Sequence, residues 1–139
     1  MDWDDYEDWG KRIAQWGAAY HKSLRDLPVR SQVSPGQVSE SIPASAPEEP
    51  EDVSQIMADF DQFILPGITH WQHPRFFAYF PSNAAPPSIL ADFLSATLSS
   101  QGILWQMSPA ATELETSMME WMRDAVGLPS EFSGVIQDS

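Results

Sequence analysis

Residues 70–81 read HWQHPRFFAYFP, the stretch of this 139-residue chain in which aromatic side chains stand closest together. Their spacing follows no helical period, so no helix is predicted there. Two interpretations of the cluster stay open: a plug of side chains in a hydrophobic core, or one wall of a pocket for a ligand that carries its own ring. In the second interpretation, the phenolic hydroxyl of Tyr79 supplies the polar group that orients the ligand.

The chain before this stretch has the pattern of one long amphipathic helix. From Trp3 to Leu27 the large residues recur every three or four positions, and Pro28 follows, which predicts a helix that ends there. Because a stripe with three tryptophans is too apolar to face water, we expect it to be buried against another element or subunit, with adsorption to a membrane as the lesser alternative. The stripe consists of Trp3, Tyr6, Trp9, Ile13, Trp16, Tyr20, Leu24 and Leu27.

A proline-rich connector is expected over residues 29–52, because its prolines and its run of acidic residues favour an extended chain over a regular element. Asp52 is then placed to cap a packing helix, which Pro66-Gly67 ends. The apolar positions of this helix are Val53, Ile56, Met57, Phe60, Phe63 and Ile64.

Two more helices are predicted after the aromatic stretch, so this segment is expected to be mainly α. Pro86-Pro87 opens the first, which covers residues 88–100. Ser108 as N-cap and Pro109 at the first helical position begin the second, which Gly127 ends. The side chains expected to point inward are Ile89, Leu90, Phe93, Leu94 and Leu98 in the first helix and Leu114, Met118, Trp121, Met122 and Ala125 in the second.

The charge balance is strongly acidic, with seven Lys and Arg against 20 Asp and Glu and a formal net charge of −13. No basic stripe is present to follow a phosphate backbone or an anionic lipid surface, so neither nucleic acid nor a membrane is expected as a partner. The absence of cysteine excludes disulfides, thiolate nucleophiles and cysteine-based zinc sites. The start MDWDDYEDW lacks the form of a signal peptide, and no apolar run is long enough to span a bilayer, so a cytoplasmic protein is expected.

Few residues have the spacing that catalysis or metal binding requires. His70 and His73 stand three apart without a third ligand, so no metal site is predicted. No G-x-S-x-G motif points to a hydrolase. Glu113 and Glu115 stand two apart on a predicted helix, where they face different sides and cannot form an acid–base pair. The glycine-led run GVIQ at 134–137 is by itself a weak sign of a phosphate-binding loop.

Several short motifs stand in a fixed order along the chain: APE at 46–48, PGITHW at 66–71, QHPRFFAYFP at 72–81, ILAD at 89–92, Trp105, SPA at 108–110, TELE at 112–115 and GVIQ at 134–137. This order and spacing resemble the group II pyridoxal-phosphate-dependent decarboxylases, nearest to aromatic-L-amino-acid decarboxylase. The likeness covers nearly the whole chain.

The resemblance implies a homodimeric α/β enzyme of the fold-type I architecture, of which this chain is the N-terminal part. Residues 1–85 would be the helical dimerisation segment with its proline-rich connector. Residues 86–139 would begin the large domain that binds pyridoxal 5'-phosphate. The implied partners are the remaining C-terminal part of the enzyme, on the same or a separate chain, the second subunit and an amino-acid substrate.

The resemblance also implies which residues touch the substrate and the cofactor. Ser139 is the implied first contact to the cofactor phosphate. Animal aromatic decarboxylases usually carry an aromatic residue at the position of Ile103, so the identity of the substrate stays open. The family's catalytic lysine lies beyond Ser139, and Lys11 and Lys22 lie on the polar face of the first predicted helix, so no catalytic residue is expected in this chain. The expected substrate-pocket residues are Trp71, Tyr79, Phe80, Pro81 and Ser82, with Ile103 and Leu104 contributed to the pocket of the other subunit.

The implied reaction is the decarboxylation of an aromatic L-amino acid to an amine and carbon dioxide, and the segment by itself is expected to be inactive. Three alternatives remain. The first is an aldehyde-forming synthase, or another amino-acid decarboxylase, of the same family. The second is a non-catalytic interaction fragment. The third is a self-processed pyruvoyl decarboxylase that is cleaved beside Ser139.

Overall fold

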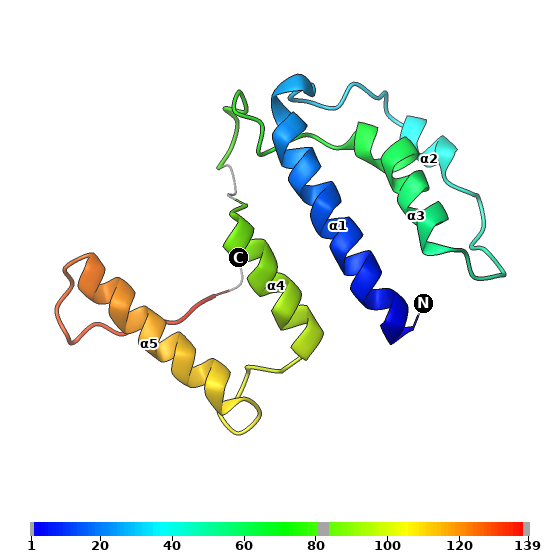
Figure 1. Cartoon of the computed structure of the whole chain (residues 1–139). Coiled ribbons are helices and arrows are strands. Elements are labelled where there is room, and N and C mark those ends of the chain that lie inside the picture. The colour runs from blue at the N-terminus through cyan, green and yellow to red at the C-terminus, as the bar shows by residue number, and fades with distance from the viewer. Residues whose placement is uncertain (1, 81–83, 138–139) are drawn as a thin grey trace. The chain divides into compact units, whose positions relative to one another are not determined.

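The computed structural model describes residues 2–80 and 84–137 (Figure 1). The chain divides into two compact units, Met1–Ala84 and Ala85–Ser139. Within the described ranges all regular structure is helical and no strand occurs, as the sequence predicts.

The first helix, α1, covers Trp3–Ser23 and continues as a 3₁₀ turn, Leu24–Asp26. It therefore follows the predicted range closely. Its N-terminus is closed by a reciprocal cap that the sequence analysis missed. The carboxylate of Asp2 accepts hydrogen bonds from the backbone N–H groups of Asp4 and Asp5, each at 3.0 Å, and the Asp5 carboxylate accepts one from the Asp2 N–H at 3.3 Å. Such a box satisfies amide groups that have no partner within the helix.

The C-terminal half of the aromatic stripe on α1 packs against residues that lie far along the chain. Trp16 stacks on Tyr20 with ring centroids 5.4 Å apart and meets Phe60 edge-on at 5.5 Å. Its indole N–H donates to Asp61 at 2.9 Å. Leu24, 5% exposed, is the one buried apolar residue in the described chain. At the other end of the stripe, Trp3 and Ile13 are exposed, while Tyr6 and Trp9 are half-buried. The expected burial is therefore incomplete at the N-terminal end.

The connector contains a short helix that its composition did not predict. This helix, α2, covers Gln37–Ser41 and begins after Gly36, whose φ is +91°. The Gln37 side chain accepts a hydrogen bond from the Ser34 N–H at 3.0 Å and so supports the turn that starts the helix. The expectation of a wholly extended connector is therefore wrong at this point, because local side-chain bonds and a left-handed glycine can close one turn in a proline-rich segment.

The packing helix is present and consists of three pieces. The α-helix α3, Val53–Asp59, is followed by a π-helical turn, Phe60–Ile64, and by a 3₁₀ turn, Leu65–Gly67. Asp52 caps α3 as predicted, and its carboxylate accepts from the Ser54 N–H at 2.7 Å. A widened turn of this kind changes the direction in which later side chains point. It lies where Phe60 and Asp61 meet Trp16 of α1.

The second unit contains α4, Pro86–Leu98, and α5, Pro109–Ala125. Pro86 opens α4 and Pro109 opens α5, as predicted. Ser108 stands at the N-cap position of α5, but its side chain makes no capping bond. Its backbone carbonyl accepts from the N–H and hydroxyl of Thr112 instead. The expected side-chain cap is therefore wrong.

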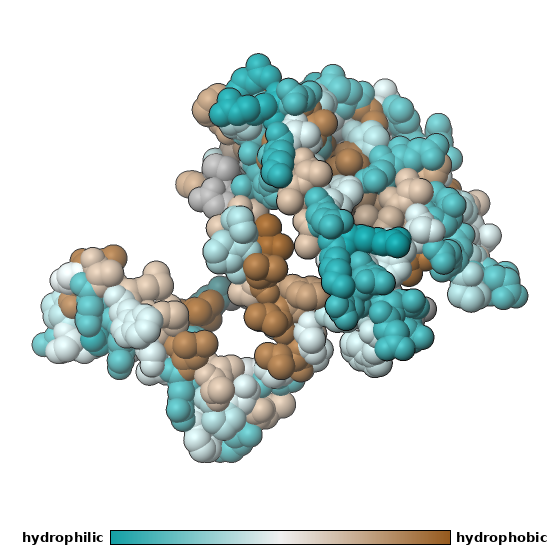
Figure 2. Space-filling view, in the orientation of Figure 1, coloured by the Kyte–Doolittle hydropathy of each residue, from teal (hydrophilic) through white to brown (hydrophobic). Residues whose placement is uncertain are grey.

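The side chains expected to point inward from α4 and α5 are mostly exposed in this chain. Figure 2 shows hydrophobic residues gathered over α4. Of the ten positions only Met118 is partly buried. Two helices without a further layer cannot cover each other's apolar faces, so the faces remain open. The exposed positions are Ile89, Leu90, Phe93, Leu94 and Leu98 on α4 and Leu114, Trp121, Met122 and Ala125 on α5.

Candidate functional site

The aromatic stretch folds back on itself so that two of the predicted pocket residues stack. The ring centroids of Trp71 and Tyr79 lie 5.8 Å apart, with an angle of 17° between the ring planes. The ring centroid of Phe76 lies 4.9 Å from that of Trp71. Tyr79 has a φ of +55°, in the left-handed region that side chains other than glycine rarely adopt. Phe80 follows with 97% of its surface exposed. Pro81 and Ser82, also predicted for the pocket, lie outside the described residues.

Two buried histidines lie at the start of the aromatic stretch. His70 and His73 are 4% and 3% exposed. The Tyr20 hydroxyl lies 2.8 Å from Nδ1 of the His70 ring. The backbone N–H of His70 donates to the Val29 carbonyl at 3.0 Å. Burial lowers the pKa of His70 below 6.5, and the neighbouring His73 adds to this. A buried neutral imidazole therefore joins α1 to the start of the aromatic stretch.

His73 contributes to the local turn. Its Nδ1 accepts a hydrogen bond from the Arg75 backbone N–H at 3.0 Å, while its buried Nε2 has no partner among the described residues. Since Nδ1 accepts, a neutral His73 carries its proton on Nε2. Neither histidine belongs to a group of three or more side chains in the described ranges that could hold a metal ion.

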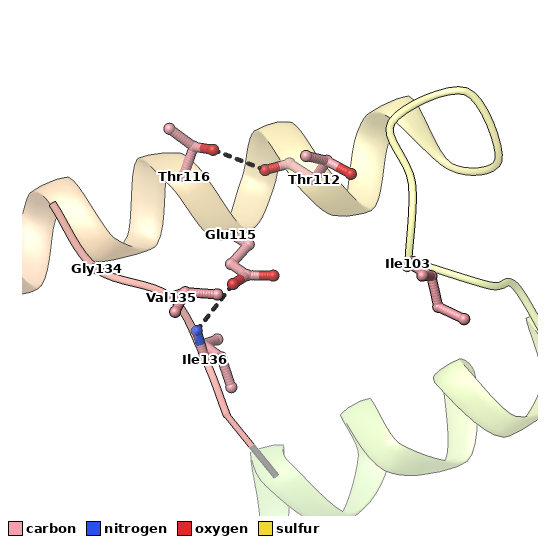
Figure 3. Close-up of a pocket in the computed structure, with 8 residues that line it drawn as sticks. Ile103, Thr112, Glu115, Thr116, Gly134, Val135 and Ile136 are labelled. Atoms are coloured by element: carbon pink, nitrogen blue, oxygen red, sulfur yellow. Dashed lines mark hydrogen bonds between the residues drawn. The ribbon is translucent and has the colours of Figure 1, made fainter.

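The second unit has a pocket of about 400 Å³ beside α5 (Figure 3). Ile103, one of the two residues predicted to reach the other subunit's substrate, lies on its wall and is 79% exposed. Leu104, the other, is exposed beside it. The complete lining is Gly102, Ile103, Thr112, Glu115, Thr116, Gly134, Val135 and Ile136.

Two carboxylates of α5 hold the segments on either side of this pocket. Oε1 of Glu113 accepts from the indole N–H of Trp105 at 2.9 Å. Oε1 of Glu115 accepts from the backbone N–H of Ile136 at 2.9 Å, the bond drawn in Figure 3. The two side chains thus serve different segments, as their spacing predicts. Their partners were not predicted, because bonds to residues 8 and 21 positions away leave no periodic signal.

The family model of the pyridoxal-dependent decarboxylase conserved domain matches residues 35–138. Phenylacetaldehyde synthase of Arabidopsis thaliana is 43% identical over 145 residues, which cover all of this chain and 30% of that protein. Tryptophan decarboxylase 2 of Oryza sativa subsp. japonica is 42% identical over 143 residues, which cover 99% of this chain and 29% of that protein. The chain belongs to the pyridoxal-dependent decarboxylase family.

A solved structure has the same fold. The crystal structure of Catharanthus roseus tryptophan decarboxylase in complex with L-tryptophan matches with a TM-score of 0.94 at 36% identity, over 100% of this chain and 31% of that one. The predicted fold class is therefore confirmed: a mainly helical segment that corresponds to the N-terminal part of such decarboxylases. The chain spans about 30% of the length of the relatives it matches. In the described ranges, no helix is both long and apolar enough to cross a membrane.

Two backbone amides beside α5 have the donor chemistry that a phosphate group requires. Gly134 and Val135 offer backbone N–H groups that bind no other described group, and free amides after a glycine suit a phosphate. Ser139, the predicted phosphate contact, lies outside the described residues. The aldehyde of the cofactor would need a lysine, but Lys11 is ion-paired with Glu7 at 2.8 Å and Lys22 is exposed on the same helix.

Proposed function

We propose that this chain forms the N-terminal part of a pyridoxal-phosphate-dependent decarboxylase of aromatic L-amino acids. In this proposal residues 1–85 form the dimerisation segment and part of the substrate pocket, and residues 86–139 begin the cofactor domain. The remaining part of the enzyme and a second subunit complete the site. The expected cytoplasmic location belongs to the same proposal.

The observation that carries the proposal is the stacked pair of Trp71 and Tyr79. A flat, exposed aromatic pair gives a substrate ring a face to pack against, and the Tyr79 hydroxyl offers one polar contact for its orientation. The strained backbone at Tyr79 supports a functional role, because left-handed aromatic residues persist only where the surroundings hold them.

The remaining assigned residues complete the pocket in this proposal. Phe80, Pro81 and Ser82 are further residues of this pocket, and Ile103 with Leu104 reaches the pocket of the other subunit. Packing of the substrate side chain would fix the orientation of the bond that breaks. The cofactor itself, when bound, would accept the electrons that carbon dioxide leaves behind.

The experiment that tests the proposal is an absorbance spectrum and intact mass of the native particle. A visible-violet band that borohydride abolishes, together with the cofactor mass on a lysine outside residues 1–139, is the expected result. A particle that consists of this 15.5 kDa chain alone and has no such band would overturn the enzymatic proposal. A pyruvoyl group generated by cleavage beside Ser139 would appear in the same mass measurement.

Stable folding of residues 1–139 as a monomer would favour the second alternative, a non-catalytic interaction fragment. Aggregation or unfolding of the isolated chain is the result expected from the exposed faces of α4 and α5.

An aldehyde synthase is the second candidate function, favoured by the 43% identity to phenylacetaldehyde synthase. Both reactions release carbon dioxide, so carbon dioxide alone cannot distinguish them. Ammonia and hydrogen peroxide, measured with L-phenylalanine, L-tyrosine and L-tryptophan as substrates, would identify the synthase. An amine without either product identifies the decarboxylase.

A further inference from the structure

Helix α5 holds two segments that have little hydrogen bonding of their own. The loop between α4 and α5 contains one turn, in which Met107 and Ser108 donate to the Leu104 carbonyl at 2.9 and 3.3 Å. Ile103 precedes this turn and projects into solvent. The indole of Trp105, bound to Glu113, is therefore the side-chain contact that ties the loop to the helix.

The second segment, residues 134–136, lies along α5 in an extended conformation. The bond from Ile136 to Glu115 is the hydrogen bond that its backbone makes within the described chain. Gly134 adds a close contact, since a Cβ atom there would lie 3.2 Å from Sδ of Met119. The position of this segment along α5 thus depends on one carboxylate and one methionine.

Glu113 and Glu115 are suited to hold two segments at once. Residues two apart on a helix project on different sides, so one rigid backbone sets the separation of both anchors. Neither carboxylate has a cationic partner among the described residues. Each accepts a hydrogen bond from a neutral donor, an indole N–H for Glu113 and a backbone N–H for Glu115. A charged carboxylate makes such bonds stronger than a neutral acceptor would.

We propose that Glu113 and Glu115 are positioning residues of the enzyme's site, which hold the substrate loop and the cofactor segment at a fixed separation on α5. Glu113 acts through Trp105 on Ile103. Glu115 acts through Ile136 on the backbone amides of Gly134 and Val135. This inference rests on the proposed function, which assigns a substrate to the first segment and the cofactor phosphate to the second.

The test compares four variants of the full-length protein: Glu113→Ala, Glu115→Gln, Glu115→Ala and, as the matched control, Glu120→Gln. Glu120 lies on the same helix, is exposed, and its side chain makes no hydrogen bond or ion pair with any described residue. The readouts are the dissociation constant for pyridoxal phosphate, the KM and kcat for L-tryptophan and L-tyrosine, and the hydrogen exchange of the Ile136 amide. Circular dichroism checks that each variant is folded.

Glu115→Ala should accelerate exchange of the Ile136 amide and weaken pyridoxal phosphate binding about tenfold, the size expected for one lost hydrogen bond to a charged group. Glu115→Gln keeps an acceptor oxygen, so its affinity should stay within about threefold of the unmodified protein. Glu113→Ala, which removes the acceptor of the Trp105 indole N–H, should raise KM severalfold and leave cofactor affinity unchanged. Glu120→Gln should change none of these quantities.

Two results distinguish a failure of this inference from a failure of the proposed function. If the unmodified protein binds pyridoxal phosphate but Glu115→Ala binds it equally well, despite faster exchange at Ile136, the positioning role is wrong and the enzyme assignment stands. If the unmodified full-length protein binds no pyridoxal phosphate, the proposed function fails and the inference fails with it.

Discussion

The Tyr20 hydroxyl lies 2.8 Å from Nδ1 of His70, fifty positions further along the chain. This hydrogen bond joins α1 to the residue directly before Trp71. Because His70 is buried, losing its partner leaves a polar atom without compensation.

Tyr20→Phe should therefore lower the free energy of unfolding of the N-terminal unit by about 1 kcal/mol. Hydrogen exchange at the backbone amides of α1 in the full-length protein measures the change. Tyr79→Phe removes the hydroxyl from an exposed ring that makes no hydrogen bond to a described residue, so it should leave exchange in α1 unchanged. Equal effects of the two variants would contradict the role of the Tyr20 hydroxyl.

The N-terminal unit should lose stability in mild acid because of His70. Its pKa in the folded chain lies below the ordinary 6.5, since burial disfavours the charged form. The unfolded chain therefore binds the proton first, and the free energy of unfolding falls as the pH drops from above 6.5 through the folded pKa. Urea denaturation between pH 8 and pH 5 measures this slope. His70→Gln should flatten it, whereas the exposed His21→Gln should not.

The two capped helices should fray in stronger acid. Hydrogen bonds from backbone amides lower the pKa of Asp2, and those from the Ser54 side chain and backbone lower the pKa of Asp52, both below 3.8. Each cap is therefore fully present above pH 3.8 and is lost as the pH falls through the lowered value. Chemical shifts of the first turns of α1 and α3 would follow the loss. Asn at either position caps without titrating, so Asp2→Asn and Asp52→Asn should remove the pH dependence.

Two glycines should respond differently to the same substitution. A Cβ at position 67 would lie 2.8 Å from Cγ2 of Val38, a branched side chain with little freedom to move. A Cβ at position 134 would meet the flexible thioether of Met119 at 3.2 Å. Gly67→Ala should therefore cost about 2 kcal/mol, and Gly134→Ala less than about 1 kcal/mol. Thermal unfolding measures the stability of both variants. A larger loss of stability for Gly134→Ala than for Gly67→Ala would contradict the packing around these two glycines.

The substrate clamp makes a prediction about rate. In the full-length enzyme, Tyr79→Ala and Ile103→Ala should each slow a single turnover on an aromatic amino acid by about tenfold, because each removes one surface that orients the substrate. Phe132→Ala, an exposed aromatic change far along the chain from both, is the control. Single-turnover rates that both substitutions leave unchanged would refute the clamp.

Helix positions could be predicted from the sequence because their causes are local. The three-to-four spacing of the α1 stripe, Asp52 before α3 and the prolines that open α4 and α5 each act within a turn or two. The short helix α2 escaped prediction because a single turn has no period. The capping role of Ser108 was wrong because residue type does not determine which atom of the residue makes the bond.

Burial and pairing could not be predicted in the same way. The inward faces of α4 and α5 have the correct helical spacing, but burial also depends on what lies opposite, and the relatives are about three times as long as this chain. Tyr20 was identified as a stripe residue and not as the partner of His70. The motifs did identify Trp71 and Tyr79, which the structure brings together. No pattern in the sequence revealed the anchors Glu113 and Glu115.

The left-handed backbone at Tyr79 has a consequence for how this position tolerates variation. In a saturation library at codon 79, selection for folded protein alone should enrich glycine and asparagine, which adopt this conformation at little cost. Selection for turnover should instead retain tyrosine and other rings, although they keep the backbone strained. Sequencing would give the residue frequencies at position 79 in both pools. The difference between the pools would measure how much stability the wild-type tyrosine costs at a position where turnover requires a ring.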